Sequence, residues 1–528
     1  MRQPKISIIF IPPKKDKILI EKTIKSILYQ SFTDLELLLV LQEKDLKWYN
    51  KNSASINNAR VRLVITKGNT PTSLNRTLKN AHGKYICFID TFGEFKPNRV
   101  GFQYNYLRKC NVGAIGVGIE ELDEEGNTIN ILHGLTYREI RVLLFKSNII
   151  PISSLMFKKS LLSKYQLHFN IKYNHAYSYE FIVQAIQCFP MKIVKNVLSS
   201  ILTAKPTFKN EVAERLIEEN LVKIHQLKYL QVNCSRKQAI FHLKLLQGKA
   251  SSELELKSGE VWFNKLLFNN TKAGFLNRSL LYRLFETILD ENMRFQNRTR
   301  LQKEFEFTLD VVLVSFAVNR KLKDLTQQAI DSSGFISNVI VIEYNKEIRY
   351  ENATVVYPNV SFGYNKSLNI GARKGTGKYI FFGNNDLIFS PGWEVKLVAN
   401  MQKHQVISAS PLCPYHGRFF NIDANSGCFS GYETGSIFCG WAFIWTRNFY
   451  KSVGQLDETF VFWHSDDAVI HQLKECHEKH VLVTSSIVKH VESGYNTIQF
   501  LDDLTIRNYT ILETQRYDKW CELKSQHS

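Results

Sequence analysis

The chain has 528 residues, of which 44% are hydrophobic and 22% are charged, and its formal net charge is +19 at pH 7. This composition excludes intrinsic disorder, and the length favours two or three domains over one hydrophobic core. The apolar runs are far shorter than the roughly 20 residues that a membrane span requires, and no signal-peptide pattern is present, so we expect a cytoplasmic protein.

The first part of the chain predicts alternating strands and helices. Residues 6–11 form a continuous apolar run, residues 21–29 have a helical pattern, and residues 35–41 are a second apolar run. A further helical stretch ends at Gly83 and leads into an apolar strand at residues 85–89. Strands that are apolar throughout and alternate with helices predict a parallel sheet that is covered on both faces.

The sequence contains an internal repeat. Residues 73–92 (SLNRTLKNAHGKYICFIDTF) align without a gap with residues 367–386 (SLNIGARKGTGKYIFFGNND). The second segment follows the same pattern of elements, with a strand at 311–316, a helix at 321–330 and a strand at 339–342. We infer a duplication, and we expect an α/β protein with two tandem Rossmann-like domains.

The region between the copies, residues 205–307, is basic and mostly helical in pattern, with amphipathic stretches at 211–229 and 278–291. A packed helical connection is the simpler interpretation, and a docking face for a membrane or a partner protein is the alternative. The expected organisation is an α/β domain over residues 1–204, this helical region, and a second α/β domain over residues 308–528.

Polar residues follow the central strand of the second copy. Asn384, Asn385 and Asp386 come directly after the apolar residues 379–382. Ligands of such sheets bind beyond the carboxyl ends of the strands, and hard oxygen ligands suit Mg²⁺ or Mn²⁺. A turn that closes the strand is the alternative interpretation.

Two further candidates lie downstream. Asp466 and Asp467 precede a helical stretch, where a carboxylate can cap the helix or act as a general base. His490 follows an apolar strand, a position from which an imidazole can bind a metal ion or a phosphate.

The order of these features resembles glycosyltransferase family 2, inverting enzymes with a GT-A fold, from about residue 310 to 495. Asn384-Asn385-Asp386 resembles the metal-binding DxD motif of that family, and Asp466 stands at the position of its catalytic base. The resemblance implies nucleotide-sugar contacts from Ser315, Phe316, Glu343, Asn365, Asn369, Asn384 and Asn385, and acceptor contacts from Gly440, Trp441 and Asp457. Glu343 is a mild departure, because the family usually has Asp there.

The resemblance also implies a reaction and its partners. Asp386 and His490 are expected to hold a divalent cation, Mg²⁺ or Mn²⁺, while Asp466 deprotonates the acceptor hydroxyl. The donor is a nucleotide-diphospho-sugar, and the acceptor is a glycan or a lipid-linked glycan of surface polysaccharide biosynthesis. With this family, the charge of +19 favours the inner membrane surface over nucleic acid as a partner.

The first copy, about residues 4–204, departs from the family pattern. Gln42 stands where the nucleoside-contacting acid is expected, Phe92 matches Asp386, and Ser178 stands in place of the base. Since Phe cannot bind a cation, we expect a degenerate domain. Asp90 and Glu180 survive, which leaves a bifunctional polymerase open, and a non-catalytic anion-binding scaffold is the alternative from another class.

Overall fold

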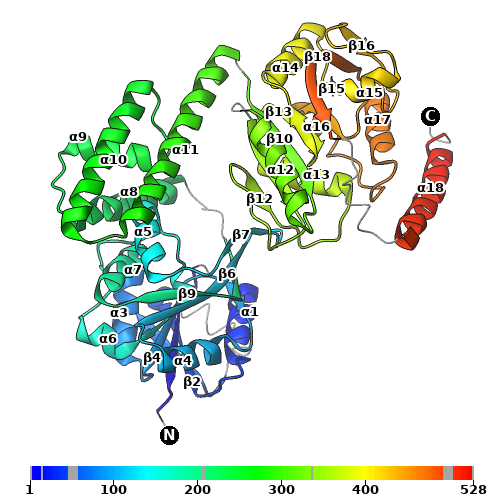
Figure 1. The fold of residues 1–528 in the computed structure, drawn as a ribbon. Coiled ribbons are helices and arrows are strands. Elements are labelled where there is room, and N and C mark those ends of the chain that lie inside the picture. The colour runs from blue at the N-terminus through cyan, green and yellow to red at the C-terminus, as the bar shows by residue number, and fades with distance from the viewer. Residues whose placement is uncertain are drawn as a thin grey trace. The chain divides into compact units, whose positions relative to one another are not determined.

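The computed structural model describes residues 3–13, 16–45, 58–203, 209–305, 307–334, 337–491 and 503–525. The chain divides into two compact units, Met1–Gly126 with Asn130–Gln296, and Asn127–Ile129 with Asn297–Ser528 (Figure 1). No helix within the described ranges is long and apolar enough to cross a membrane.

The first unit is built on a nine-stranded sheet with the order β3-β2-β1-β4-β8-β6-β9-β5, and β7 pairs with β6. Its strands are β1 (Ile6–Phe10), β2 (Leu35–Gln42), β3 (Val61–Thr66), β4 (Tyr85–Ile89), β5 (Gly93–Phe95), β6 (Ala114–Leu122), β7 (Thr128–Leu132), β8 (Leu155–Lys158) and β9 (Met191–Leu202). The helices are α1 (Lys17–Leu28), α3 (Thr70–Asn80), α4 (Arg99–Lys109), α5 (Tyr137–Lys146), α6 (Lys159–Lys164) and α7 (Tyr177–Cys188).

The second unit repeats this plan, with the order β12-β11-β10-β13-β17-β15-β18-β14, and β16 pairs with β18. Its strands are β10 (Leu309–Ser315), β11 (Ser337–Glu343), β12 (Thr354–Val356), β13 (Tyr379–Asn384), β14 (Leu387–Phe389), β15 (Ser408–Leu412), β16 (Cys428–Ser430), β17 (Ala442–Thr446) and β18 (His480–His490). The helices are α12 (Arg320–Ser332), α13 (Tyr364–Lys374), α14 (Trp393–His404), α15 (Pro414–Phe419), α16 (Arg447–Ser452), α17 (Ser465–Glu475) and α18 (Asp503–Ser525).

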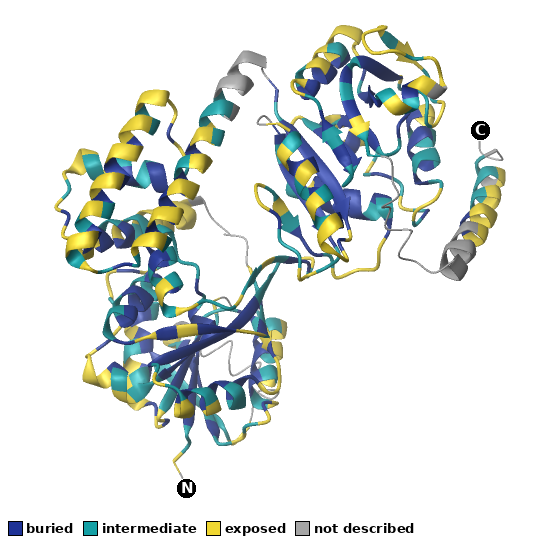
Figure 2. Cartoon of the chain, in the orientation of Figure 1, coloured by how far each residue is buried: buried dark blue, intermediate teal, exposed yellow. Residues whose placement is uncertain are grey.

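Eight strands follow the same order in the two sheets, which confirms the duplication and the expected α/β fold class. The ninth strand differs, because β7 pairs with β6 in the first sheet while β16 pairs with β18, the counterpart of β9, in the second. In each sheet the buried residues follow the strands, and exposed residues lie on the outer faces of the helices (Figure 2). The sheets are mixed rather than wholly parallel: β10 to β13 run parallel, but β17 is antiparallel to both of its neighbours, β13 and β15. Beyond β13 the strict strand–helix alternation is lost, because β14 follows β13 and β17 follows β16 with no helix between them.

The helical region consists of α8 (Lys209–Gln226), α9 (Arg236–Leu246), α10 (Glu253–Ala273) and α11 (Arg278–Phe305). Its core includes Phe263 and Phe285, whose rings stack with centroids 4.1 Å apart. Val142 and Phe145 of α5 belong to the same hydrophobic cluster. The helices therefore pack on the first α/β domain and share its core.

A buried ion pair joins the first strand of the second domain, β10, to the helix α16. Asp310, near the start of β10, lies 2.5 Å from the guanidinium of Arg447 in α16. Arg447 also donates to the carbonyls of Gly377 and Ala372, and the amide of Gly377 donates to Asp310. The pair thus connects β10, α13 and the entry to β13. Because both charges are desolvated, each depends on its partner.

Removal of one partner should be costly. In Arg447→Met we expect the unfolding free energy of this domain to fall by about 3–5 kcal/mol, because Asp310 keeps a buried, uncompensated charge. Urea unfolding followed by tryptophan fluorescence measures the change. Arg320→Met is the matched control, since Arg320 is 93% exposed where it pairs with Asp324, and should cost less than about 1 kcal/mol. Equal effects of the two substitutions would contradict this role.

Candidate functional site

The carboxyl ends of three parallel strands form one edge of the second sheet. Ser315 at the end of β10 pairs in register with Glu343 at the end of β11, and Val314 pairs with Asn384 at the end of β13. Polar side chains that follow these strands therefore gather at one place, as expected for this class of sheet.

Asp386 and His490 lie side by side at this edge. The Asp386 Oδ1 atom is 3.2 Å from the Nε2 atom of His490. Antiparallel pairing of β14 with β18 places Leu387 opposite His490, and the amide of Val491 donates to the Asp386 carbonyl. The His490 ring stacks on the indole of Trp441, with centroids 4.9 Å apart and planes 1° apart. The strand pairing thus brings the two predicted metal ligands together.

This pair suits part of a cation site. Asp386 Oδ1 and Trp441 Nε1 are buried, and in the described part of the chain neither atom has a hydrogen-bond partner. Buried polar atoms seldom stay unsatisfied, so a missing ligand explains both. No cluster of three or more His, Cys, Asp or Glu side chains that could hold a metal ion occurs among the described residues. Remaining ligands for a cation at Asp386 and His490 would come from substrate phosphates or water.

Asp466 lies in the first turn of α17 and packs against Gly440. A Cβ atom at residue 440 would lie 2.6 Å from the Asp466 Cβ, so only glycine allows this approach. Burial, and next the charge of Asp467, raise the pKa of Asp466 above its ordinary value. A raised pKa makes a carboxylate a better proton acceptor near neutral pH.

Tyr364, which we did not predict as a site residue, connects the two halves of the site. Its hydroxyl donates to Asn384 Oδ1 at 2.7 Å and lies 3.4 Å from the Gly440 carbonyl. Burial raises the Tyr364 pKa, and the charges of Asp386 and Asp466 raise it further. The hydroxyl therefore lies close to both Asn384, at the end of β13, and Gly440, which packs against Asp466. Its position directly before Asn365 was the one available signal in the sequence.

Several predicted nucleotide-sugar contacts are buried framework residues. Glu343 is 0% exposed, and its carboxylate accepts the amides of Ala317 and Asn345 and the hydroxyl of Tyr350. Ser315 is also buried, and its hydroxyl lies 3.0 Å from the Tyr350 hydroxyl. Their contacts with a nucleotide-sugar stay predictions.

The two asparagines of α13 hold the segment that leads to α17. Asn365 donates to the carbonyls of Asp457 and Ser465, and Asn369 donates to the Leu456 carbonyl. Asp457 accepts a hydrogen bond from Thr459, the second residue after it. These hydrogen bonds fix the segment that leads into α17.

Two residues that we predicted to contact the nucleotide-sugar, Phe316 and Asn385, lie at the carboxyl edge of the sheet and are not fully buried. Phe316 is 39% exposed directly after β10. The amide of Asn385 donates to Thr326 at 2.9 Å and lies 3.4 Å from the Ser315 hydroxyl.

The first domain has different chemistry at the equivalent edge. Asp90 accepts a hydrogen bond from the Tyr177 hydroxyl at 3.0 Å, and burial raises its pKa. Phe92, which replaces the cation-binding acid, is 3% exposed in the hydrophobic core. Gln42 donates to the Gly68 carbonyl, and one Glu180 oxygen is buried without a hydrogen-bond partner among the described residues. Asp90 therefore contacts a phenol, and the position that matches Asp386 holds a buried phenyl ring.

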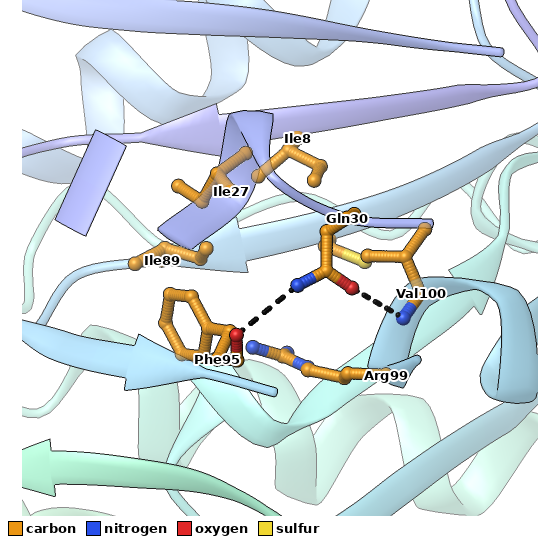
Figure 3. Close-up of a pocket in the computed structure, with 8 residues that line it drawn as sticks. Ile8, Ile27, Gln30, Ile89, Phe95, Arg99 and Val100 are labelled. Atoms are coloured by element: carbon orange, nitrogen blue, oxygen red, sulfur yellow. Dashed lines mark hydrogen bonds between the residues drawn. The ribbon is translucent and has the colours of Figure 1, made fainter. Parts of the chain in front are cut away.

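A small cavity lies inside the first domain (Figure 3). It has a volume of about 10 Å³, which holds about one water molecule. Gln30 spans one side, donating to the Phe95 carbonyl and accepting from the Val100 amide. The Arg99 guanidinium lies 4.3 Å from the Phe95 ring centroid. The cavity is far too small for a sugar and is a packing void.

Comparisons with known proteins show similarity to one family of enzymes. Glycosyl transferase family 2 matches residues 8–166 and 331–454, together more than half of the chain. The second match includes Asn384 to Asp386 and Gly440, and it ends before Asp466.

Two curated relatives are similar to parts of the chain. An uncharacterized glycosyltransferase of Methanocaldococcus jannaschii is 23% identical over 35% of this chain and 66% of its own length. The O-antigen biosynthesis glycosyltransferase WbnJ of Escherichia coli is 26% identical over 30% of this chain and 63% of its own length. The chain thus spans just under two thirds of each relative. Residues 1–349 of Staphylococcus aureus TarS in complex with UDP match at 14% identity, over 57% of this chain and 93% of that one, with a TM-score of 0.35.

The contact between Gly440 and Asp466 can be tested by adding one methyl group. In Gly440→Ala the new Cβ forces α17 away from β17, and we expect a loss of about 1–3 kcal/mol in unfolding free energy. Thermal unfolding measures it. Gly101→Ala is the control, because its nearest neighbouring atom is 3.6 Å away. An unchanged melting temperature for Gly440→Ala would refute the close approach.

Proposed function

The chain belongs to glycosyl transferase family 2, and on that premise we propose that its second domain transfers a sugar from a nucleotide-diphosphate donor to a glycan or lipid-linked acceptor. The two family matches fall one in each sheet, so the protein has two tandem GT-A domains of the Rossmann-like type. The observation that carries the proposal is the adjacency of Asp386 and His490, whose Oδ1 and Nε2 atoms are 3.2 Å apart, together with the packing of Asp466 against Gly440, the residue before Trp441 that stacks on His490.

We assign the general-base role to Asp466. Its carboxylate takes the proton of an acceptor hydroxyl, and the freed oxygen attacks the anomeric carbon of the donor. The bond from that carbon to the diphosphate breaks, the nucleoside diphosphate leaves, and the configuration inverts. The raised pKa of Asp466 supports this role, because a more basic carboxylate accepts the proton more readily.

We assign Asp386 and His490 to the stabilisation of the leaving nucleoside diphosphate. Their adjacent oxygen and nitrogen atoms suit a divalent cation, Mg²⁺ or Mn²⁺. Such a cation would neutralise charge on the departing diphosphate. Trp441 orients His490 by ring stacking, and its indole N–H, which has no hydrogen-bond partner among the described residues, can donate to a ligand oxygen.

We propose that the first domain does not catalyse. Its buried Phe92 can bind no cation, and the hydroxyl of Tyr177 already occupies Asp90. A bifunctional polymerase would instead need a shifted site at Asp90 and Glu180. A non-catalytic anion-binding scaffold would make no use of the raised pKa of the Asp466 carboxylate.

The acceptor proposal rests on similarity and charge. One similar protein is named as an O-antigen biosynthesis glycosyltransferase, which favours an acceptor in surface polysaccharide biosynthesis. The net charge of +19 suits attraction to the anionic inner surface of a membrane, where a lipid-linked acceptor would be found.

The base assignment predicts a specific loss in Asp466→Asn. We expect kcat to fall about 10²–10⁴-fold while donor binding is retained, because the amide keeps the shape but accepts no proton. A donor is first identified by thermal stabilisation with Mn²⁺ across a panel of nucleotide-sugars, and nucleoside diphosphate release is then measured.

Four outcomes separate the alternatives. Ser178→Ala should keep the parental rate, and Asp386→Ala should lose Mn²⁺-dependent donor binding. Parental transfer by Asp466→Asn would remove this residue from the mechanism. Undiminished transfer of a second kind of sugar by that variant would show that the first domain is active.

The pH profile tests the neighbours of the base. Transfer requires ionised Asp466, so the rate falls as pH drops through its raised pKa. Asp467 raises that pKa and His464 lowers it. In Asp467→Asn the acid limb of kcat should therefore move to lower pH, and in His464→Asn to higher pH. Shifts in the same direction for both variants would exclude Asp466 as the titrating group.

A further inference from the structure

Three aromatic side chains form an exposed patch on the second domain. Phe362, Phe462 and Trp463 are 36%, 37% and 38% exposed. They come from two loops, one before α13 and one before α17. The rings of Phe362 and Phe462 have centroids 6.3 Å apart, and those of Phe462 and Trp463 are 5.0 Å apart at 83°. Adjacent exposed rings of this size are uncommon unless they contact a ligand or partner.

The aromatic patch borders the proposed base. Trp463 is three residues before Asp466, and the ring of Phe462 lies 6.4 Å from that of Tyr364. The loop carbonyl of Val461 also accepts the amide of Tyr364. The patch therefore adjoins the first turn of α17, which carries Asp466, and the start of α13.

A buried carboxylate holds the loop that carries these rings. Glu513 of α18 is 2% exposed and accepts the amides of Val461, Phe462 and Trp463 at 2.5, 3.1 and 2.7 Å. The ring of Tyr517 stacks on His464 with centroids 4.0 Å apart. Hydrogen bonds to a carboxylate are stronger than neutral ones. The side chains of Phe462 and Trp463 are thus exposed, while the loop backbone is fixed by Glu513 of α18.

We propose that Phe362, Phe462 and Trp463 form a binding subsite for a saccharide ring of the acceptor, and that Glu513 is its positioning residue. This inference rests on the proposed role of Asp466. A sugar ring has faces of C–H groups and an edge of hydroxyls. Aromatic faces can cover the C–H groups while one hydroxyl points to the base, as in other sites that combine apolar walls with few polar groups.

The arrangement favours a sugar over a lipid surface. The nearly perpendicular rings of Phe462 and Trp463 make a corner, and a corner orients a ring-shaped ligand. Insertion into a bilayer needs only apolar area, and it gains nothing from a backbone fixed beside the base. A loop ordered in advance lowers the entropic cost of binding, which benefits a weakly held sugar most.

The full chain is assayed with its identified donor and a panel of methyl glycosides as acceptors. For Phe462→Ala and Trp463→Ala we expect the acceptor KM to rise about tenfold, equivalent to about 1.4 kcal/mol. Hydrolysis of the donor by water should be unchanged. The control is Phe429→Ala, which removes a ring that is 38% exposed on β16 and should leave the acceptor KM as it is.

The outcomes distinguish this inference from the proposed function. Absence of both sugar transfer and donor hydrolysis in the unsubstituted chain would overturn the proposed function. Normal hydrolysis with an unchanged acceptor KM in both aromatic variants would overturn the subsite. Loss of binding to vesicles of anionic phospholipid, with KM unchanged, would make the patch a membrane contact instead.

Glu513→Gln tests the positioning role without removing a ring. The amide keeps the size of the side chain but binds the three backbone amides less strongly. We expect a higher acceptor KM, unchanged donor hydrolysis and an unchanged circular dichroism spectrum. An unchanged acceptor KM would overturn the positioning role of Glu513.

Discussion

The second site depends on the close approach of Gly440 to Asp466. Because residue 440 has no side chain, the first turn of α17 can pack against the segment that enters β17. The next residue, Trp441, stacks on His490, and its carbonyl accepts the amide of Asn384. One short stretch of backbone therefore fixes the proposed base relative to the proposed cation ligands. A methyl group there would separate two halves that must act on one substrate.

Around this contact, the carboxylates have different surroundings. Asp386 lies beside an imidazole and keeps a buried oxygen without a hydrogen bond in the described structure, a state suited to a cation. Asp466 lies beside another acid, and its raised pKa suits proton transfer. The Tyr364 hydroxyl donates to Asn384 and lies 3.4 Å from the Gly440 carbonyl. The environments, more than the residue types, assign the proposed roles.

The two domains share a fold but differ in the residues at the edge of the sheet. Their sheets have the same strand order, although the edge residues differ. The buried ring of Phe92 adds apolar contacts where the second copy has Asp386, so the substitution stabilises the sheet while removing a ligand. Apolar strands suffice for the architecture, and the polar residues at their ends are free to change.

The sequence by itself determined the two α/β domains and the edge where polar residues gather. Continuous apolar strands are stable only in a covered sheet, and this requirement can be read locally. Tertiary structure alone decided that the sheets are mixed, that Tyr364 joins the site, that Glu343 is fully buried, and that Glu513 holds the aromatic loop. These outcomes depend on partners far apart in the chain, as with the hydrogen bond from Asn365 to Ser465, and local periodicity carries no information about such contacts.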